Sequence, residues 1–181
     1  MKENTTLLEE MEKYFNGDTK RIQHFKRVHI FAYLMGLMMR LPEDEFFILE
    51  AAAITHDIGI KTSEEKYGDC TGKHQEEEGP PAARELFTRL GYDEKVIDRV
   101  TWLIGHHHTY DNIEGMDYQI LVEADLLINM IDENTPMEGI RAAYDKIFKT
   151  WVGRAMCRGI FGIESNENEE EVRPCDISSG N

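Results

Sequence analysis

The sequence has few of the features that mark secreted or membrane-spanning proteins. It contains three cysteines, Cys70, Cys157 and Cys175, an odd number without CxxC pairing, which argues against a disulfide framework and a zinc ribbon. The longest uncharged apolar stretch, 28–39, has 12 residues and is too short to cross a bilayer. The first residues lack the basic-then-apolar profile of a signal peptide. We therefore expect a protein of the reducing cytoplasm that has no membrane partner.

Basic residues are scarce compared with acidic ones. The chain has 20 Lys and Arg against 35 Asp and Glu, a net charge of −15, which disfavours nucleic acid and anionic membranes as partners. A small anionic substrate stays compatible with this charge, because a bound divalent cation would dominate the local field. Residues 164–181 hold six acids and one arginine. We expect one domain over 1–163 followed by a weakly tethered acidic tail over 164–181, while the oligomeric state stays open.

Alternation of period two, the mark of strands, is not sustained anywhere in the sequence. Apolar residues make up 41% of the chain and charged residues 30%, the balance of a folded globular protein. Apolar positions instead recur every three or four residues, as in a long helix predicted from Asp18 to about Arg40. We expect a loop over 61–72 and a helix whose first turn holds Pro80 and Pro81. The predicted fold class is all-α, with seven or eight helices.

One carboxylate lies on an apolar stripe. On a helix, Asp125 shares a side with Tyr118, Leu121 and Ile128, and no lysine or arginine occurs over 118–132. A buried carboxylate costs several kcal/mol unless its charge is compensated. A metal ion is one form of compensation. The alternative is an aspartate at the edge of the stripe that faces water.

Two histidines have a similar setting. His56 and Asp57 follow an apolar run and are themselves followed by Gly59, which frees the backbone directly after the pair. His24 stands at the head of the apolar stripe of the preceding helix. A lone histidine of this kind is usually a hydrogen-bonded core residue. Three such residues on adjacent helices instead indicate a shared site.

Together these residues resemble a known signature. His24, then His56-Asp57-Ile-Gly, then Asp125 resembles the H…HD…D signature of the HD superfamily of metal-dependent phosphohydrolases, over roughly residues 20–130. The resemblance implies a single-domain helical HD-type fold in which His24, His56, Asp57 and Asp125 bind a divalent metal. Mixed imidazole and carboxylate donors suit Mn, Fe, Co, Ni or Zn. We expect one ion and leave a second open, and we expect Asp57 also to act in catalysis by orienting water or accepting its proton.

A histidine triplet resembles a further part of some relatives. His106 and His107, followed by His108, match the ligand pair in the HHExxDG segment of binuclear HD-GYP phosphodiesterases, so we expect His106 and His107 to be catalytic. Those relatives have another histidine where Gln75 stands here, and His74 is out of register by one residue, about 100° on a helix. We therefore expect His106 or His107, but not His74, to face the metal. A polar helix end capped by one ring is the alternative.

The function implied by the resemblance is a metal-dependent phosphohydrolase that uses a metal-activated water. Its substrate would be a small phosphorylated metabolite such as a nucleotide or a related phosphoester, a class taken from the family rather than from these residues. One alternative is an HD-fold di-iron oxygenase. Another is a non-catalytic HD module that binds a nucleotide or a partner protein.

Overall fold

The computed structural model describes residues 4–164, and all regular structure in that range is helical. This confirms the all-α class. The predicted tail lies outside the described residues apart from Glu164. The elements are α1 (Thr5–Phe15), α2 (Thr19–Met38), α3 (Glu43–Thr55), the 3-10 helix η1 (His56–Gly59), α4 (Ile60–Tyr67), α5 (Gly72–Leu90), α6 (Glu94–Ile104), α7 (Met116–Asp132), α8 (Met137–Lys146) and α9 (Trp151–Phe161).

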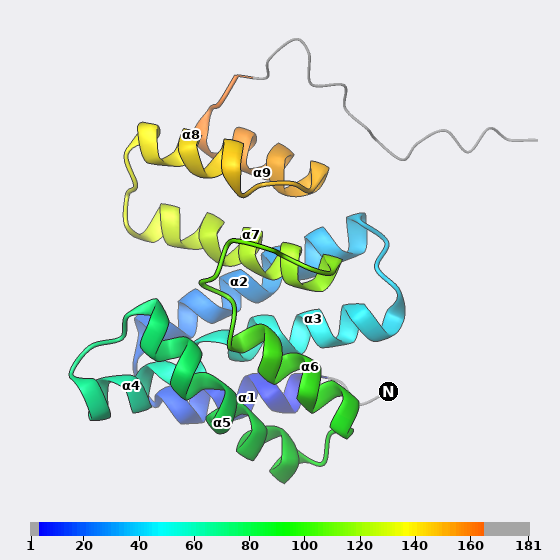
Figure 1. The fold of residues 1–181 in the computed structure, drawn as a ribbon, viewed down its shortest axis with the longest axis vertical. Coiled ribbons are helices and arrows are strands. Elements are labelled where there is room, and N and C mark those ends of the chain that lie inside the picture. Colours follow the sequence, from blue (N-terminus) through cyan, green and yellow to red (C-terminus); the bar gives the residue numbers. More distant parts are fainter. Residues whose placement is uncertain (1–3, 165–181) are drawn as a thin grey trace, which may run out of the picture.

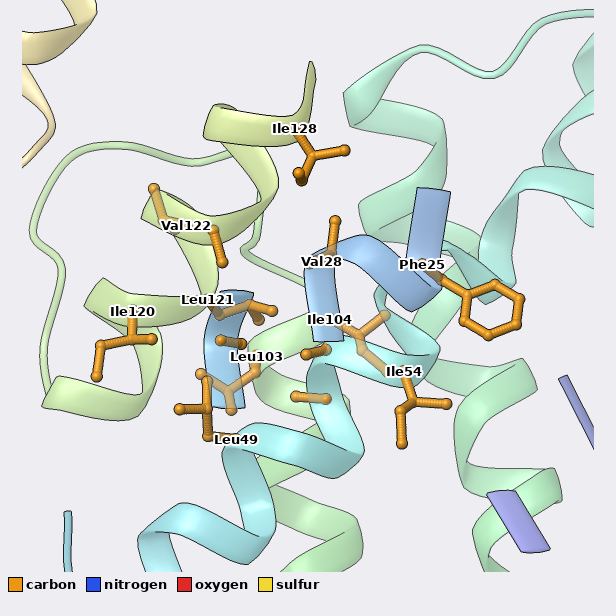
Figure 2. Packing of buried hydrophobic residues seen from close by; sticks show 14 of the residues in the cluster. Phe25, Val28, Leu49, Ile54, Leu103, Ile104, Ile120, Leu121, Val122 and Ile128 are labelled. Atoms are coloured by element: carbon orange, nitrogen blue, oxygen red, sulfur yellow. The ribbon is translucent and has the colours of Figure 1, made fainter. Parts of the chain in front are cut away.

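Three helices form the centre of the fold. α2 packs against both α3 and α7, which also contact each other, while α5 and α6 pair beside them and α8 and α9 lie beyond α7 (Figure 1). Side chains from these elements, among them Val28, Leu49, Leu103 and Leu121, meet in one hydrophobic core (Figure 2). No helix within residues 4–164 is long and apolar enough to span a membrane.

The first ligand-bearing helix begins where the sequence indicates. The Asp18 side chain accepts a hydrogen bond from the backbone N–H of Arg21 at 3.1 Å, which caps the start of α2. One side of α2, including His24, Val28 and Met35, is buried. The cap and this stripe together fix which way His24 points.

The His56–Asp57 pair lies in a tight turn between two helices. α3 ends at Thr55, and η1 then carries the pair against α5. A Cβ added to Gly59 would meet the Gln75 carbonyl oxygen and the Gly79 nitrogen, both at 2.7 Å. Only a glycine lets the two backbones come this close. Gly59 thus holds His56 and Asp57 next to α5.

The segment expected to be a loop instead begins with a helix. Residues 60–67 form α4, and the remaining turn from Gly68 leads into α5. Lys61 donates to the Tyr14 carbonyl oxygen at 2.5 Å, and Arg21 pairs with Glu64. These contacts with other elements order residues whose own composition is that of a loop.

The predicted start of the next helix was also wrong. α5 begins at Gly72, so Pro80 and Pro81 lie inside it rather than in its first turn. Each proline removes one backbone hydrogen bond, a cost that tertiary contacts must offset. Two side-chain hydrogen bonds stabilise the helical turns before the prolines. Gln75 donates to the Cys70 carbonyl oxygen at 2.8 Å, and Glu78 accepts from the Tyr67 hydroxyl at 2.9 Å.

Candidate metal centre

Four of the predicted site residues come together from three elements. His24 comes from α2, His56 and Asp57 from η1, and Asp125 from α7. Nε2 of His24 lies 3.1 Å from Oδ1 of Asp125 and 3.6 Å from Oδ2 of Asp57. Nε2 of His56 lies 3.3 Å and 3.4 Å from the same two oxygens. The four side chains thus surround one small space, and each of the four residues is at least nine-tenths buried.

The remaining hydrogen bonds fix the tautomer of His56. Its Nδ1 donates to the Ala53 carbonyl oxygen at 2.9 Å, so the Nε2 of a neutral ring carries a lone pair. That Nε2 is buried and has no hydrogen-bond partner, yet it faces carboxylate oxygens of Asp57 and Asp125. Lone pairs opposite one another repel unless a cation lies between them.

His24 is supported from behind by a second carboxylate. Its Nδ1 lies 3.2 Å from Oδ2 of Asp132, and Arg27 donates to both oxygens of Asp132 at 2.7 Å. This is the arrangement in which a carboxylate orients a metal-binding imidazole and raises its basicity. Asp125 is held similarly, because Asn129 donates to its Oδ2 at 2.9 Å and leaves Oδ1 toward the imidazoles.

A second group of possible ligands shares Asp57. His107 and His108 each offer a nitrogen within 4.8 Å of an Asp57 oxygen and of each other. Nε2 of His107 lies 3.9 Å from Oδ1 of Asp57, while Nδ1 donates to the Ile104 carbonyl oxygen at 2.7 Å. The Nε2 atoms of His107 and His108 are both buried without a hydrogen-bond partner.

His106 and His74 lie elsewhere. The His106 ring stacks on Trp102, with ring centroids 4.1 Å apart, and its Nδ1 donates to the Trp102 carbonyl oxygen. His74 stacks on Tyr67 and pairs with Asp69 at 2.7 Å. Of the two histidines expected to be catalytic, His107 is therefore the one that the structure brings to Asp57, and His108 accompanies it.

The pKa values of His56 and His107 are shifted in opposite directions. Burial by itself would lower the pKa of His56, but the charges of Asp57 and Asp125 raise it to about 9. Burial and the charges of His108 and His56 lower the pKa of His107 to about 3. Near neutral pH a proton on His56 can therefore balance the negative charge of the carboxylates, whereas His107 does not take up a proton. A divalent cation fits both, since neutral imidazoles and carboxylates are ligands of transition metals.

The cluster opens into a cavity of about 540 Å³. His24, Asp57 and His108 line it, so the candidate ligands are reachable from solvent. Lys20 and Arg21, from the first turn of α2, also line this cavity. Arg21 pairs with Asp18 and Glu64, whereas Lys20 is exposed.

Comparison with known protein families agrees with this geometry. The model of the HD domain matches residues 21–144, about two thirds of the chain. The chain belongs to the HD domain family. Members of this family are generally hydrolases that bind divalent metals, and the family suggests the metal-dependent phosphohydrolase superfamily. Searches of the curated proteins and of the solved structures gave no match.

Several residues that complete the site were missed in the sequence. Asp132 follows Asp125 by seven residues, two helical turns along the same side of α7, so helical spacing could have found it. His108 was missed because the triplet was aligned with His106 and His107 as the ligand pair, one residue before the pair that lies beside Asp57. Lys20 lies one turn before His24, a signal too common in sequences to single out.

Proposed function

We propose that this protein is a metal-dependent phosphohydrolase that acts on a small phosphorylated metabolite, such as a nucleotide or a related phosphoester. The observation that carries the proposal is the set of buried imidazole Nε2 atoms that have no hydrogen-bond partner and face carboxylate oxygens at the end of an accessible cavity. His24, His56, Asp57 and Asp125 would hold a first transition-metal ion. Asp57, His107 and His108 would hold a second.

The metal, when bound, would supply a Lewis acid for a phosphoryl oxygen and a water of lowered pKa. With only the first metal bound, Oδ2 of Asp57 would be its ligand beside His24 and His56, and Oδ1, on the His107 side, would be free to act as the general base. With a second metal, Asp57 would be a ligand of both. His107 stays neutral by burial, so its Nε2 lone pair would be available to the second metal or, in its absence, to a hydrogen bond. Lys20 and Arg21 would bind the substrate's non-reacting anionic groups.

A di-iron oxygenase is the second candidate. Like the proposal, it rests on the observation that the two groups of possible ligands share Asp57, as a carboxylate common to two metals would require. It requires two irons, whereas hydrolysis would proceed with other divalent metals.

One experiment distinguishes these functions. The protein is purified without chelator, its metals are quantified, and each candidate metal is then tested against a panel of nucleotides and phosphoesters. Phosphate or pyrophosphate release that disappears with a chelator and returns with the metal supports the proposal. Two irons with oxygen uptake and no phosphate release would support the oxygenase, and neither metal nor turnover would leave a non-catalytic binding module.

A further inference from the structure

Helix α2 is apolar on two sides, and the fold covers one of them. Val28, Ala32 and Met35 point into the core and are fully buried. The other side carries five large apolar residues with exposed fractions of 39–56%, here called the outer stripe: Ile30, Tyr33, Leu34, Leu37 and Met38. A helix that is apolar all round is normally buried all round.

The outer stripe is a continuous row. Its members recur at spacings of three and four residues, so they lie on one line along the helix. Other exposed apolar side chains on the described residues, such as Met137 on α8 and Ile160 on α9, come from separate elements. Single exposed apolar residues are ordinary, but a contiguous row marks an interaction surface.

We propose that the outer stripe is a self-association surface, at which α2 packs against α2 of a second copy of this chain. The charge distribution favours a second copy. The chain carries −15 overall, so most pairs of surfaces would repel, but α2 has no Asp or Glu between Thr19 and Met38. The same net charge opposes an anionic membrane as the occupant.

The charges at the two ends of the stripe select an antiparallel arrangement. Lys26 lies at its N-terminal end in an exposed ion pair with Glu12, a surface pair that contributes little and that a contact with a second copy can replace, while Arg27 is committed to Asp132. Glu43, Asp44 and Glu45 form the first turn of α3 just beyond the C-terminal end of the stripe. An antiparallel pair places each basic end beside the acidic turn of the other copy. A parallel pair would place the two acidic turns together, which costs free energy through like-charge repulsion.

A two-fold axis at Leu34 fits this arrangement. Leu34 then meets Leu34 of the second copy, and Ile30 meets Met38 of the second copy. The stripe is about 12 Å long at the helical rise, enough for the apolar centre of an interface but not for a standard patch of about 800 Å² per partner. We therefore expect a dimer that dissociates on dilution.

Sedimentation equilibrium of the full chain tests the proposal. At about 100 μM we expect twice the chain mass of 21.0 kDa, falling toward one chain on dilution. Leu34→Glu places two carboxylates at the axis and should raise the dissociation constant at least about 100-fold. Ile160→Glu, a similarly exposed apolar residue on α9, is the matched control and should leave the dimer intact. Circular dichroism checks that both variants are folded.

A charge exchange tests the antiparallel geometry. Lys26→Glu and Glu43→Lys should each weaken the dimer, and the double variant should restore it. A wild-type monomer at about 100 μM, or equal weakening by Ile160→Glu, overturns the proposed surface. A monomer that co-sediments with phosphatidylserine vesicles would assign the stripe to a membrane instead. A dimer that the double variant fails to restore overturns the antiparallel arrangement.

Discussion

Two carboxylates on α7, two residues apart, differ in what surrounds them. Glu123 and Asp125 are 0% and 1% exposed. Oε1 of Glu123 accepts hydrogen bonds from the backbone N–H groups of Lys149 and Thr150, at 2.6 and 2.8 Å, and from Gln119 at 2.7 Å. The Thr150 hydroxyl donates to Oε2. Glu123 is thus satisfied by the protein and ties α7 to the segment before α9.

Asp125 accepts one bond from Asn129 and otherwise faces the imidazoles of His24 and His56. Burial alone would raise its pKa, but the hydrogen bonds and charges of these imidazoles lower it well below the usual range. Burial raises the pKa of Glu123, against the lowering effect of its hydrogen bonds. Burial of a carboxylate therefore does not by itself indicate a metal. The type of atom that faces the carboxylate does.

The largest effect is expected at Asp57, the carboxylate common to both groups of ligands. Asp57→Asn keeps the shape but removes the charge and the proton-accepting oxygen, so turnover should fall at least about 100-fold while the fold is retained. Steady-state rates at matched metal occupancy measure this effect. Turnover like that of the wild type would contradict the role proposed for Asp57.

The α7 pair itself offers a matched comparison. Asp125→Asn should lower metal affinity at least about 100-fold, because an amide is a weaker ligand than a carboxylate. Glu123→Gln should leave metal affinity unchanged and destabilise the fold by about 1–3 kcal/mol, since its new N–H donors face other donors. Metal titration and urea unfolding of both variants measure the two quantities. If Glu123→Gln lost metal while remaining folded, the assignment of Asp125 to metal binding and of Glu123 to fold stability would be wrong.

The helical class was predicted from local pattern, while the convergence of His24, His56, Asp57 and Asp125 was implied by the resemblance to the HD signature. The sequence did not predict α4, whose helix is held by Tyr14 and Arg21, far away along the chain. It placed Pro80 at a helix start because proline is locally favoured in the first turn of a helix. In the structure, contacts of residues 72–79 stabilise the helical turns before Pro80, so α5 begins earlier and continues past it. Elements ordered by long-range contacts were therefore the ones that local reasoning missed.

A smaller effect on metal affinity is expected at Asp132, which contacts His24 on the side away from the metal site. Asp132→Asn keeps a side chain of the same size but removes the charge that orients the His24 ring, so metal affinity should fall about 10- to 100-fold. Asp44→Asn, at an exposed aspartate, is the control and should change nothing. Competition with a metal-chelating dye measures the affinity. Unchanged affinity in Asp132→Asn would mean that His24 does not depend on this carboxylate.

The smallest effects are expected in the histidine triplet, where neighbouring residues should behave differently. His107→Ala removes a buried imidazole that faces Asp57, so turnover should fall about 10-fold or more, with little loss of the first metal. His106→Ala removes a ring that packs on Trp102, and His74→Ala one that packs on Tyr67, so each should change turnover less than about 2-fold. Metal content must be measured beside the rates. If His74→Ala released a metal, the second group of ligands would have to be redrawn around α5, because His74 would then have to leave Tyr67 and turn toward Asp57.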